Sequence, residues 1–94
     1  MTVKEIRNKI LPVLQSYGAS RVGLFGSAAR GTMHADSDVD ILVDIPKNIN
    51  LLDFVGIKQQ LEKILKKKVD LVEYQTLKPA LRKKILQQQI VLYE

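Results

Sequence analysis

Cysteine and tryptophan are both absent from the 94 residues of this chain. Without cysteine, the chain can form neither disulfides nor thiolate metal sites. No apolar run approaches the ~20 residues that a membrane-spanning helix needs. The N-terminal sequence MTVKEIRNKI is charged from its fourth residue and so lacks the apolar core of a signal peptide. We therefore expect a soluble, cytoplasmic protein without a membrane partner.

Aromatic residues are also scarce, at 5% of the chain. They are spread along the sequence and do not form the interleaved stacking platform that binds single-stranded nucleic acid. The formal net charge of +5 suits anionic partners such as nucleotides, nucleic acid or an acidic protein. Because a well-solvated basic surface would give the same charge, a nucleic-acid partner is the weakest interpretation.

The composition is that of one small globular domain. Hydrophobic residues make up 46% and charged residues 27% of the sequence, close to the average for folded domains. A chain of this size buries roughly two-thirds of its unfolded surface, enough for a single core. We expect residues 1–94 to form one domain, with no room for a separate substrate-recognition domain.

Hydrophobic periodicity predicts an α/β (α+β) fold. Apolar residues recur at helical spacing between Thr2 and Gly18, and Glu5 completes a capping box with Thr2. Further helices are predicted over 51–65 and 79–88, and strands over 21–25, 38–45, 69–74 and 90–93, with a polar loop over 31–37. The order of these elements favours a small mixed sheet with helices packed on one face.

One motif stands out against this background. Gly26 and Ser27 follow the first strand, and after ten residues Asp38 and Asp40 occur in the second. At average residue usage, such a pattern arises by chance on the order of once in a thousand chains of this length. Alternation along 38–45 places both aspartates on the face opposite Val39 and Ile41.

Paired carboxylates on one face of a strand are the ligands expected for magnesium. Unit charges 4 Å apart repel by about 4 kcal/mol at an effective dielectric of 20, a cost that a divalent cation removes. Mg²⁺ prefers carboxylate oxygens together with substrate phosphates, and two such ions can serve an attacking and a leaving oxygen. Asp70, on the next strand, is the candidate third carboxylate, although it would also fit a simple exposed strand position.

The strand-to-helix turn supplies candidate phosphate ligands. Glycine at position 26 permits close backbone approach, and Ser27 offers a hydroxyl and an amide. A helical turn that opens at Ala28 would direct further amides at the same anion. Arg30 lies one turn on, where it could pair with a phosphate or a carboxylate, or could be an ordinary surface arginine.

These residues carry a resemblance to a known family. The segments GSAARG and SDVDILVD resemble the DNA-polymerase-β-like nucleotidyltransferase superfamily, and the short length is similar to its minimal nucleotidyltransferase (MNT) branch. The resemblance implies a triphosphate held by Gly26 and Ser27, and two Mg²⁺ ions bound by Asp38 and Asp40. It also implies that Asp70 assists deprotonation of an acceptor hydroxyl.

The resemblance further implies a role and a partner. Family members of this size are often antitoxins paired with HEPN-domain toxins, and some transfer AMP from ATP to a tyrosine of the toxin. A small chain with an intact carboxylate set favours this enzymatic interpretation. The alternative is a non-catalytic antitoxin or binding module that neutralises its partner by occlusion. The acceptor, the base preference and the stoichiometry do not follow from the sequence.

Overall fold

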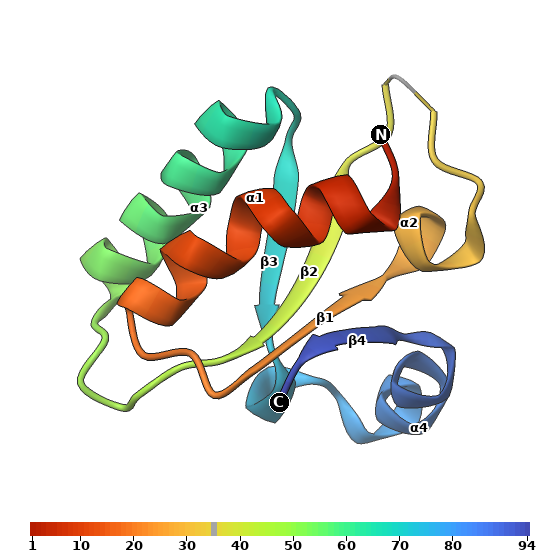
Figure 1. Cartoon of the computed structure of the whole chain (residues 1–94). Helices are drawn as coiled ribbons and strands as arrows, with labels where there is room; N and C mark the ends of the chain where they lie inside the picture. Colours follow the sequence, from red (N-terminus) through yellow and green to blue (C-terminus); the bar gives the residue numbers. More distant parts are fainter. Residues whose placement is uncertain (35) are drawn as a thin grey trace.

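The computed structural model describes residues 1–34 and 36–94. Ala35, within the predicted loop 31–37, lies outside the described residues. The elements, in chain order, are α1 (Val3–Ser16), β1 (Arg21–Phe25), α2 (Gly26–Arg30), β2 (Val39–Asp44), α3 (Leu51–Leu65), β3 (Val69–Glu73), the 3-10 turn η1 (Tyr74–Thr76), α4 (Pro79–Gln88) and β4 (Ile90–Tyr93) (Figure 1). Within this part of the chain, no helix is long and apolar enough to cross a membrane.

The two long helices begin at residues that cap them. At α1, the Glu5 amide donates to Thr2 Oγ1 over 3.1 Å, and the Thr2 amide donates to the Glu5 side chain, which confirms the predicted capping box. At α3, the Asp53 amide donates to Asn50 Oδ1 over 2.8 Å, and the Asn50 amide donates to the Asp53 side chain. Each cap satisfies donors that the first helical turn leaves free, worth typically ~1 kcal/mol.

Four strands form one mixed sheet in the order β3-β2-β1-β4. β1 pairs antiparallel with both β2 and β4, whereas β2 and β3 run parallel, joined by α3. A parallel pair needs a crossover of this kind, because the chain must return to the end where β2 began. β2 and β3 therefore start at the same end of the sheet.

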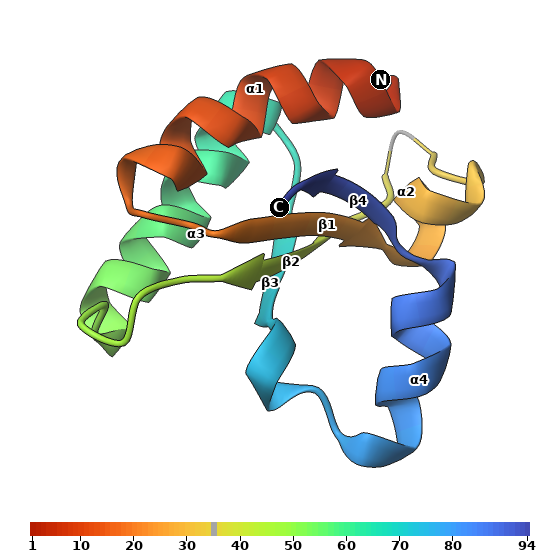
Figure 2. The ribbon, with the colours of Figure 1, turned by 60° about the horizontal axis from the view of Figure 1, so that its bottom comes forward.

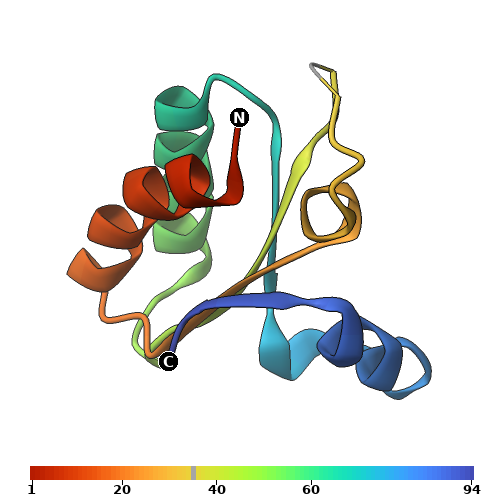
Figure 3. The same ribbon diagram turned by 45° about the vertical axis from the view of Figure 1, so that its right-hand side comes forward.

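The main core lies between one face of the sheet and the helices α1 and α3, which cover that face side by side (Figures 1 and 3). The alternating apolar residues of the strands meet the apolar stripes of both helices, as the periodicity predicts. The fully buried members include Ile6, Ile10, Leu14, Val22, Leu24, Val39, Ile41, Val43, Ile57 and Leu61. The predicted small mixed sheet is thus confirmed, and its two long helices pack on one face.

The opposite face is covered over part of its area by η1 and α4 (Figure 2). Tyr74 is buried there, and its hydroxyl donates to Gln89 Oε1 over 2.6 Å. Both oxygens occupy the space that a Cβ would take at Gly23 of β1. The Arg21 guanidinium lies 4.2 Å from the centre of the Tyr74 ring, and Arg82 Nη1 donates to the Tyr74 carbonyl. This network closes one half of the face.

Four predicted boundaries differ from the structure. β2 begins at Val39, whose amide makes a 2.9 Å hydrogen bond to the Lys68 carbonyl, so Asp38 precedes the strand. The same strand ends at Asp44, one residue before its predicted end at 45. β3 ends at Glu73, because Tyr74 turns into η1. α2 begins at Gly26, two residues earlier than the helical turn predicted from Ala28. The first difference matters most, because the alternation of side chains along β2 does not fix the direction of the Asp38 side chain.

Candidate active site

The open half of this second face carries the predicted acidic residues. Asp40 of β2 is paired in register with Asp70 of β3, on adjacent parallel strands whose backbones lie ~4.8 Å apart. Asp38 lies two residues before Asp40, directly before the first residue of β2, and is exposed. Because β2 and β3 start at the same end, the topology brings all three carboxylates to one end of the sheet.

The three carboxylates interact electrostatically, and Asp40 is the most affected. Partial burial, followed by the nearby charges of Asp70 and Asp38, raises the pKa of Asp40 from 3.8 to about 6; the positive charge of Arg30 acts in the opposite direction. Desolvation and like charges both disfavour the ionised form of a carboxyl group. A raised carboxyl pKa inside an acidic cluster is a common property of functional sites.

Gly26 is required by the position of Asp40. Its φ of 65° lies in the left-handed region, and a Cβ built on it would collide with Asp40 Oδ2. From the sequence, we expected glycine here because a phosphate would approach the backbone closely. The structure gives a second reason, because the Asp40 carboxylate occupies the space that a side chain at position 26 would need. Ser27 follows in the first turn of α2, and Ala28 packs into the core. The Gly-Ser turn and the acidic cluster are therefore in contact.

Arg30 ends the same short helix. It is exposed, and its charge reaches Asp40 strongly enough to oppose the rise in pKa. The sequence left open whether Arg30 faces a phosphate, a carboxylate or only solvent. The structure places its charge beside the acidic cluster, where it adds a cation next to any bound polyphosphate.

The residue types at this site fit magnesium. Among residues 1–34 and 36–94, no group of three or more His, Asp and Glu side chains is placed so that it could hold a metal ion. Mg²⁺ does not require such a group, because it is usually bound by one or two carboxylates together with waters and substrate phosphates. After burial, the like charges of Asp70 and Asp38 raise the pKa of Asp40 further, and a divalent cation would relieve this repulsion.

The segment before Asp38 is tied to the start of β3. Lys67 Nζ donates to the His34 carbonyl over 3.0 Å, and the His34 amide donates to Ser37 Oγ over 2.8 Å. His34 is exposed. The lysines at 66–68 precede β3 and lie at the same end of the sheet as the aspartates. They add positive charge to this end of the sheet.

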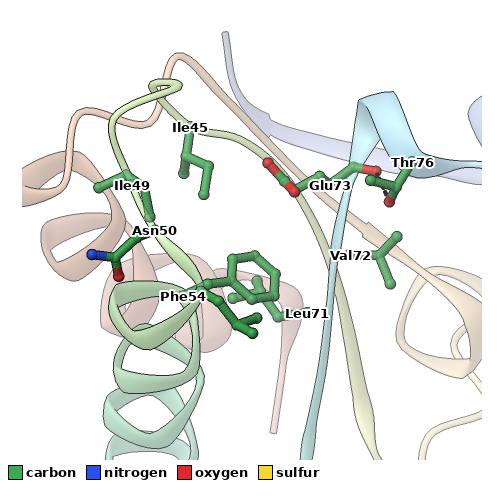
Figure 4. Close-up of a pocket in the computed structure, with 9 residues that line it drawn as sticks. Ile45, Ile49, Asn50, Phe54, Leu71, Val72, Glu73 and Thr76 are labelled. Carbon is green, nitrogen blue, oxygen red and sulfur yellow. Dashed lines mark hydrogen bonds between the residues drawn. The ribbon is translucent and has the colours of Figure 1, made fainter.

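One feature was missed by the sequence reasoning: a cavity of about 430 Å³ between the start of α3 and the end of β3 (Figure 4). Its walls combine apolar residues with the polar side chains of Asn50 and Thr76 and one acidic side chain. They include Ile45, Ile49, Leu51, Phe54, Leu71 and Glu73. Glu73 follows the buried positions 69 and 71 at strand spacing, but only the three-dimensional structure places α3 beside it.

Comparison with known proteins identifies the family. The model of the family described as "Polymerase beta, Nucleotidyltransferase" matches residues 8–94. A Methanocaldococcus jannaschii protein, provisionally named a protein adenylyltransferase, is 40% identical over 96% of this chain and 97% of its own length. The protein adenylyltransferase MntA of Thermococcus cleftensis is 39% identical over 90% of this chain and 79% of its own.

Solved structures agree with this assignment. A toxin-antitoxin structure with AMP-PNP contains a chain that superimposes with a TM-score of 0.82 and 29% identity, over 93% of this chain and 72% of that one. The family match spans nearly the whole sequence, including the Gly-Ser turn and all three aspartates. The resemblance inferred from the motifs is thereby confirmed: this chain belongs to the polymerase-β nucleotidyltransferase family.

Proposed function

We propose that this nucleotidyltransferase transfers AMP from ATP to a tyrosine hydroxyl group of a partner protein, and that it acts as the antitoxin of a HEPN-domain toxin. The observation that carries the proposal is the cluster of Asp38, Asp40 and Asp70 beside the Gly26-Ser27 turn. Relatives of similar length that are named protein adenylyltransferases support the reaction class.

ATP is the proposed donor. Gly26 and Ser27 would receive its triphosphate at the start of α2, and Arg30, at the other end of that helix, would add a positive charge. A chain with 29% identity to this one belongs to a toxin-antitoxin structure with AMP-PNP, an analogue of ATP, which supports a nucleoside triphosphate at this fold position. No residue in the described part of the chain is assigned to reading the base.

Asp38 and Asp40 are the proposed magnesium ligands, with Asp70 next to them. Bound Mg²⁺ would neutralise charge on the triphosphate and on the departing pyrophosphate. The like charges of Asp70 and Asp38 near Asp40 support a cation at this position. Asp70 is exposed and lies on the edge strand, where an acceptor could approach it.

The proposed reaction is a single in-line displacement. The acceptor oxygen attacks the α-phosphorus of ATP, so that a new P–O bond forms while the bond between the α-phosphorus and the bridging oxygen breaks. Pyrophosphate leaves with that oxygen, and the acceptor proton passes to Asp70 or to water. The protein contributes mainly positioning and electrostatic stabilisation, which supply most of the catalysis in phosphoryl transfer.

The acceptor is proposed to belong to another protein. The described residues form one sheet and its helices, and the elements among them are used to build this single layer pair and not a separate substrate-holding unit. The partner would bring its own tyrosine to the acidic cluster. Similarity to an antitoxin-containing structure supports a toxin as that partner.

The test is transfer of labelled AMP to the product of the neighbouring gene, located by mass spectrometry. We expect Asp38→Asn and Asp40→Asn each to reduce transfer by at least ~100-fold, as loss of a key electrostatic group does elsewhere. Asp44→Asn is the matched control, because Asp44 lies on the same face of β2 at its other end. It should retain activity near that of the unaltered protein.

Two outcomes would contradict the proposal. Undiminished transfer in both aspartate variants would remove the acidic cluster from the reaction. Equal protection against the toxin with and without Mg·ATP would favour the alternative, a binding module that acts by occlusion. In that case, the variants should neutralise the partner as well as the unaltered protein does.

A further inference from the structure

The edge strand β3 is only partly closed on its outer side. In the sheet order, β3 has β2 as its neighbour on one side and lies at the edge on the other. The parallel ladder with β2 uses the backbone groups of Asp70 and Val72, since the Val39 amide bonds to the Lys68 carbonyl. Backbone groups of alternate residues point to opposite sides of a strand, so those of Val69, Leu71 and Glu73 point outward.

The first outward amide is already occupied. Val69 N–H donates to Glu62 Oε2 of α3 over 3.0 Å. Within residues 1–34 and 36–94, the outward amides of Leu71 and Glu73 make no hydrogen bond. Glu62 therefore caps the start of the edge and leaves its second half able to pair with another extended segment.

A cavity lies beside this uncapped half. Leu71 and Glu73 point into it from β3, and Val72 also lines it, although its side chain lies on the other side of the strand (Figure 4). Phe54 and Ile49 form the facing wall. Glu73 is the one charged side chain that lines the cavity, and it is half-buried with no ion pair among the described residues. A cavity with apolar wall residues and a single unpaired carboxylate suits a lysine or arginine, whose aliphatic stem packs and whose cation pairs.

The uncapped edge is continuous with the candidate active site. Asp70 precedes Glu73 by three residues, so its side chain projects to the opposite face, toward Asp40. A segment paired with β3 would point successive side chains alternately to the cavity and to the acidic cluster. Three strand residues span roughly 10 Å, which fixes the spacing between the two contacts.

We propose that the acceptor segment of the partner protein binds by adding a strand to the uncapped half of β3. A basic side chain of the segment enters the cavity at Glu73, and its hydroxyl residue, three positions away, reaches Asp70 on the other face. This proposal rests on the proposed adenylyl transfer and specifies how its protein substrate is recognised. Strand addition is a common mode of peptide recognition, in which the backbone gives affinity and alternate pockets give specificity.

The first experiment uses synthetic acceptor peptides with one tyrosine and one lysine, separated by two, three or four positions. With Mg·ATP, we expect kcat/KM for the peptide with three-position spacing to exceed that for the two-position and four-position peptides by about tenfold. Only an odd spacing places tyrosine and lysine on opposite faces of the added strand, so that the lysine can pair with Glu73. Glu73→Gln should remove the preference, and Glu73→Lys should transfer it to peptides that carry glutamate in place of lysine.

Two further variants separate the backbone from the charge. Glu73 has φ −79°, a value that proline adopts, so Glu73→Pro removes the outward amide without straining the strand. We expect it to lower kcat/KM below that of Glu73→Gln. Glu94→Gln is the matched control, since Glu94 follows the strand at the opposite edge of the sheet. It should leave the spacing preference unchanged.

A binding measurement gives a readout that does not depend on catalysis. Hydrogen exchange at the amides of Leu71 and Glu73 should slow when the peptide with three-position spacing is added, whereas Val69, already bonded to Glu62, should not change. Both amides could instead be protected from exchange before any peptide is added, with a protection that increases with protein concentration. That result would mean that a second copy of the chain pairs with the edge, and it would overturn the proposal.

The failures of the two proposals are distinguishable. If the unaltered protein adenylylates the peptides or its partner with no effect of spacing and no effect of Glu73, the docking proposal is wrong and the proposed function stands. If no acceptor is modified under any condition, both are wrong. Unchanged exchange at Leu71 and Glu73 with saturating peptide would also refute strand addition.

Discussion

Replacing Asp40 by asparagine should make the ligand-free protein more stable while it abolishes activity. Asp40 is half-buried beside Asp70 and Asp38, and its pKa is raised from 3.8 to about 6. At neutral pH the carboxyl group is therefore ionised against both desolvation and like charges. An amide of nearly the same shape removes the charge and leaves the packing beside Gly26 in place.

The size of the effect follows from the pKa. A shift of about two pK units corresponds to at most ~3 kcal/mol at ~1.36 kcal/mol per unit. Because Asp40 retains substantial solvent exposure, screening reduces this ceiling, and we expect a gain of about 1 kcal/mol. For a domain of this length, that gain raises Tm by about 4–8 °C.

The raised pKa of Asp40 also predicts how the stability difference between the two proteins changes with pH. Between pH 3.8 and about 6, the folded protein keeps the Asp40 proton while the unfolded chain has lost it, so this group makes folding less favourable as pH rises through that window. Urea denaturation in EDTA should show the full advantage of Asp40→Asn at pH 7.5 and almost none near pH 3.5. Asp44→Asn serves as the control at the other end of β2.

A variant less stable than the unaltered protein at pH 7.5 would refute this reasoning. So would an advantage that stays constant down to pH 3.5, because the gain would then come from packing or solvation and not from ionisation. Addition of Mg·ATP should reverse the order, since a ligand that binds only the unaltered site stabilises only that protein.

Three other substitutions test the supporting structure. Gly26→Ala should cost at least ~1–2 kcal/mol from the left-handed φ of 65° and should also abolish transfer by displacing Asp40; an active Gly26→Ala protein of normal stability would contradict this. Tyr74→Phe should lower the free energy of unfolding by about 1 kcal/mol through loss of the hydrogen bond to Gln89, measured by urea denaturation, with little change in activity. Asn50→Ala should cost about 1 kcal/mol by removing the α3 cap, whereas Asn48→Ala, at an exposed position outside the helix, should have almost no effect.

Elements with a strong local signal could be predicted from the sequence. The cap pair Thr2 and Glu5 and the N-cap Asn50 each specify a helix start by short-range hydrogen bonding, and both starts are confirmed. The alternation from Val39 onward specifies the strand and its two faces. Boundaries were less accurate where the outcome depends on a distant partner: Asp38 leaves β2 because the ladder with Lys68 begins one residue later.

The candidate site could be anticipated only in part. Spacing within one strand indicated Asp38 and Asp40, and Asp70 followed from the next strand. The reason for Gly26 could not be found this way, since its collision partner is 14 residues away in sequence and is brought close only by the pairing of β1 and β2. The role of Tyr74 in covering the sheet likewise depends on contacts with Gln89 and Arg21 that no local pattern encodes.

The connection between α3 and β3 has only three residues, 66–68, and includes the left-handed cap Lys66. One residue more or fewer there would shift β3 by one position and turn Asp70 from the reactive face into the core. In the turn between β2 and α3, residues 47 and 48 are exposed and lie outside both elements. Variation in length should therefore be tolerated at 47–48 and rejected at 66–68, because the short lysine-rich connection sets the register that aligns the third carboxylate.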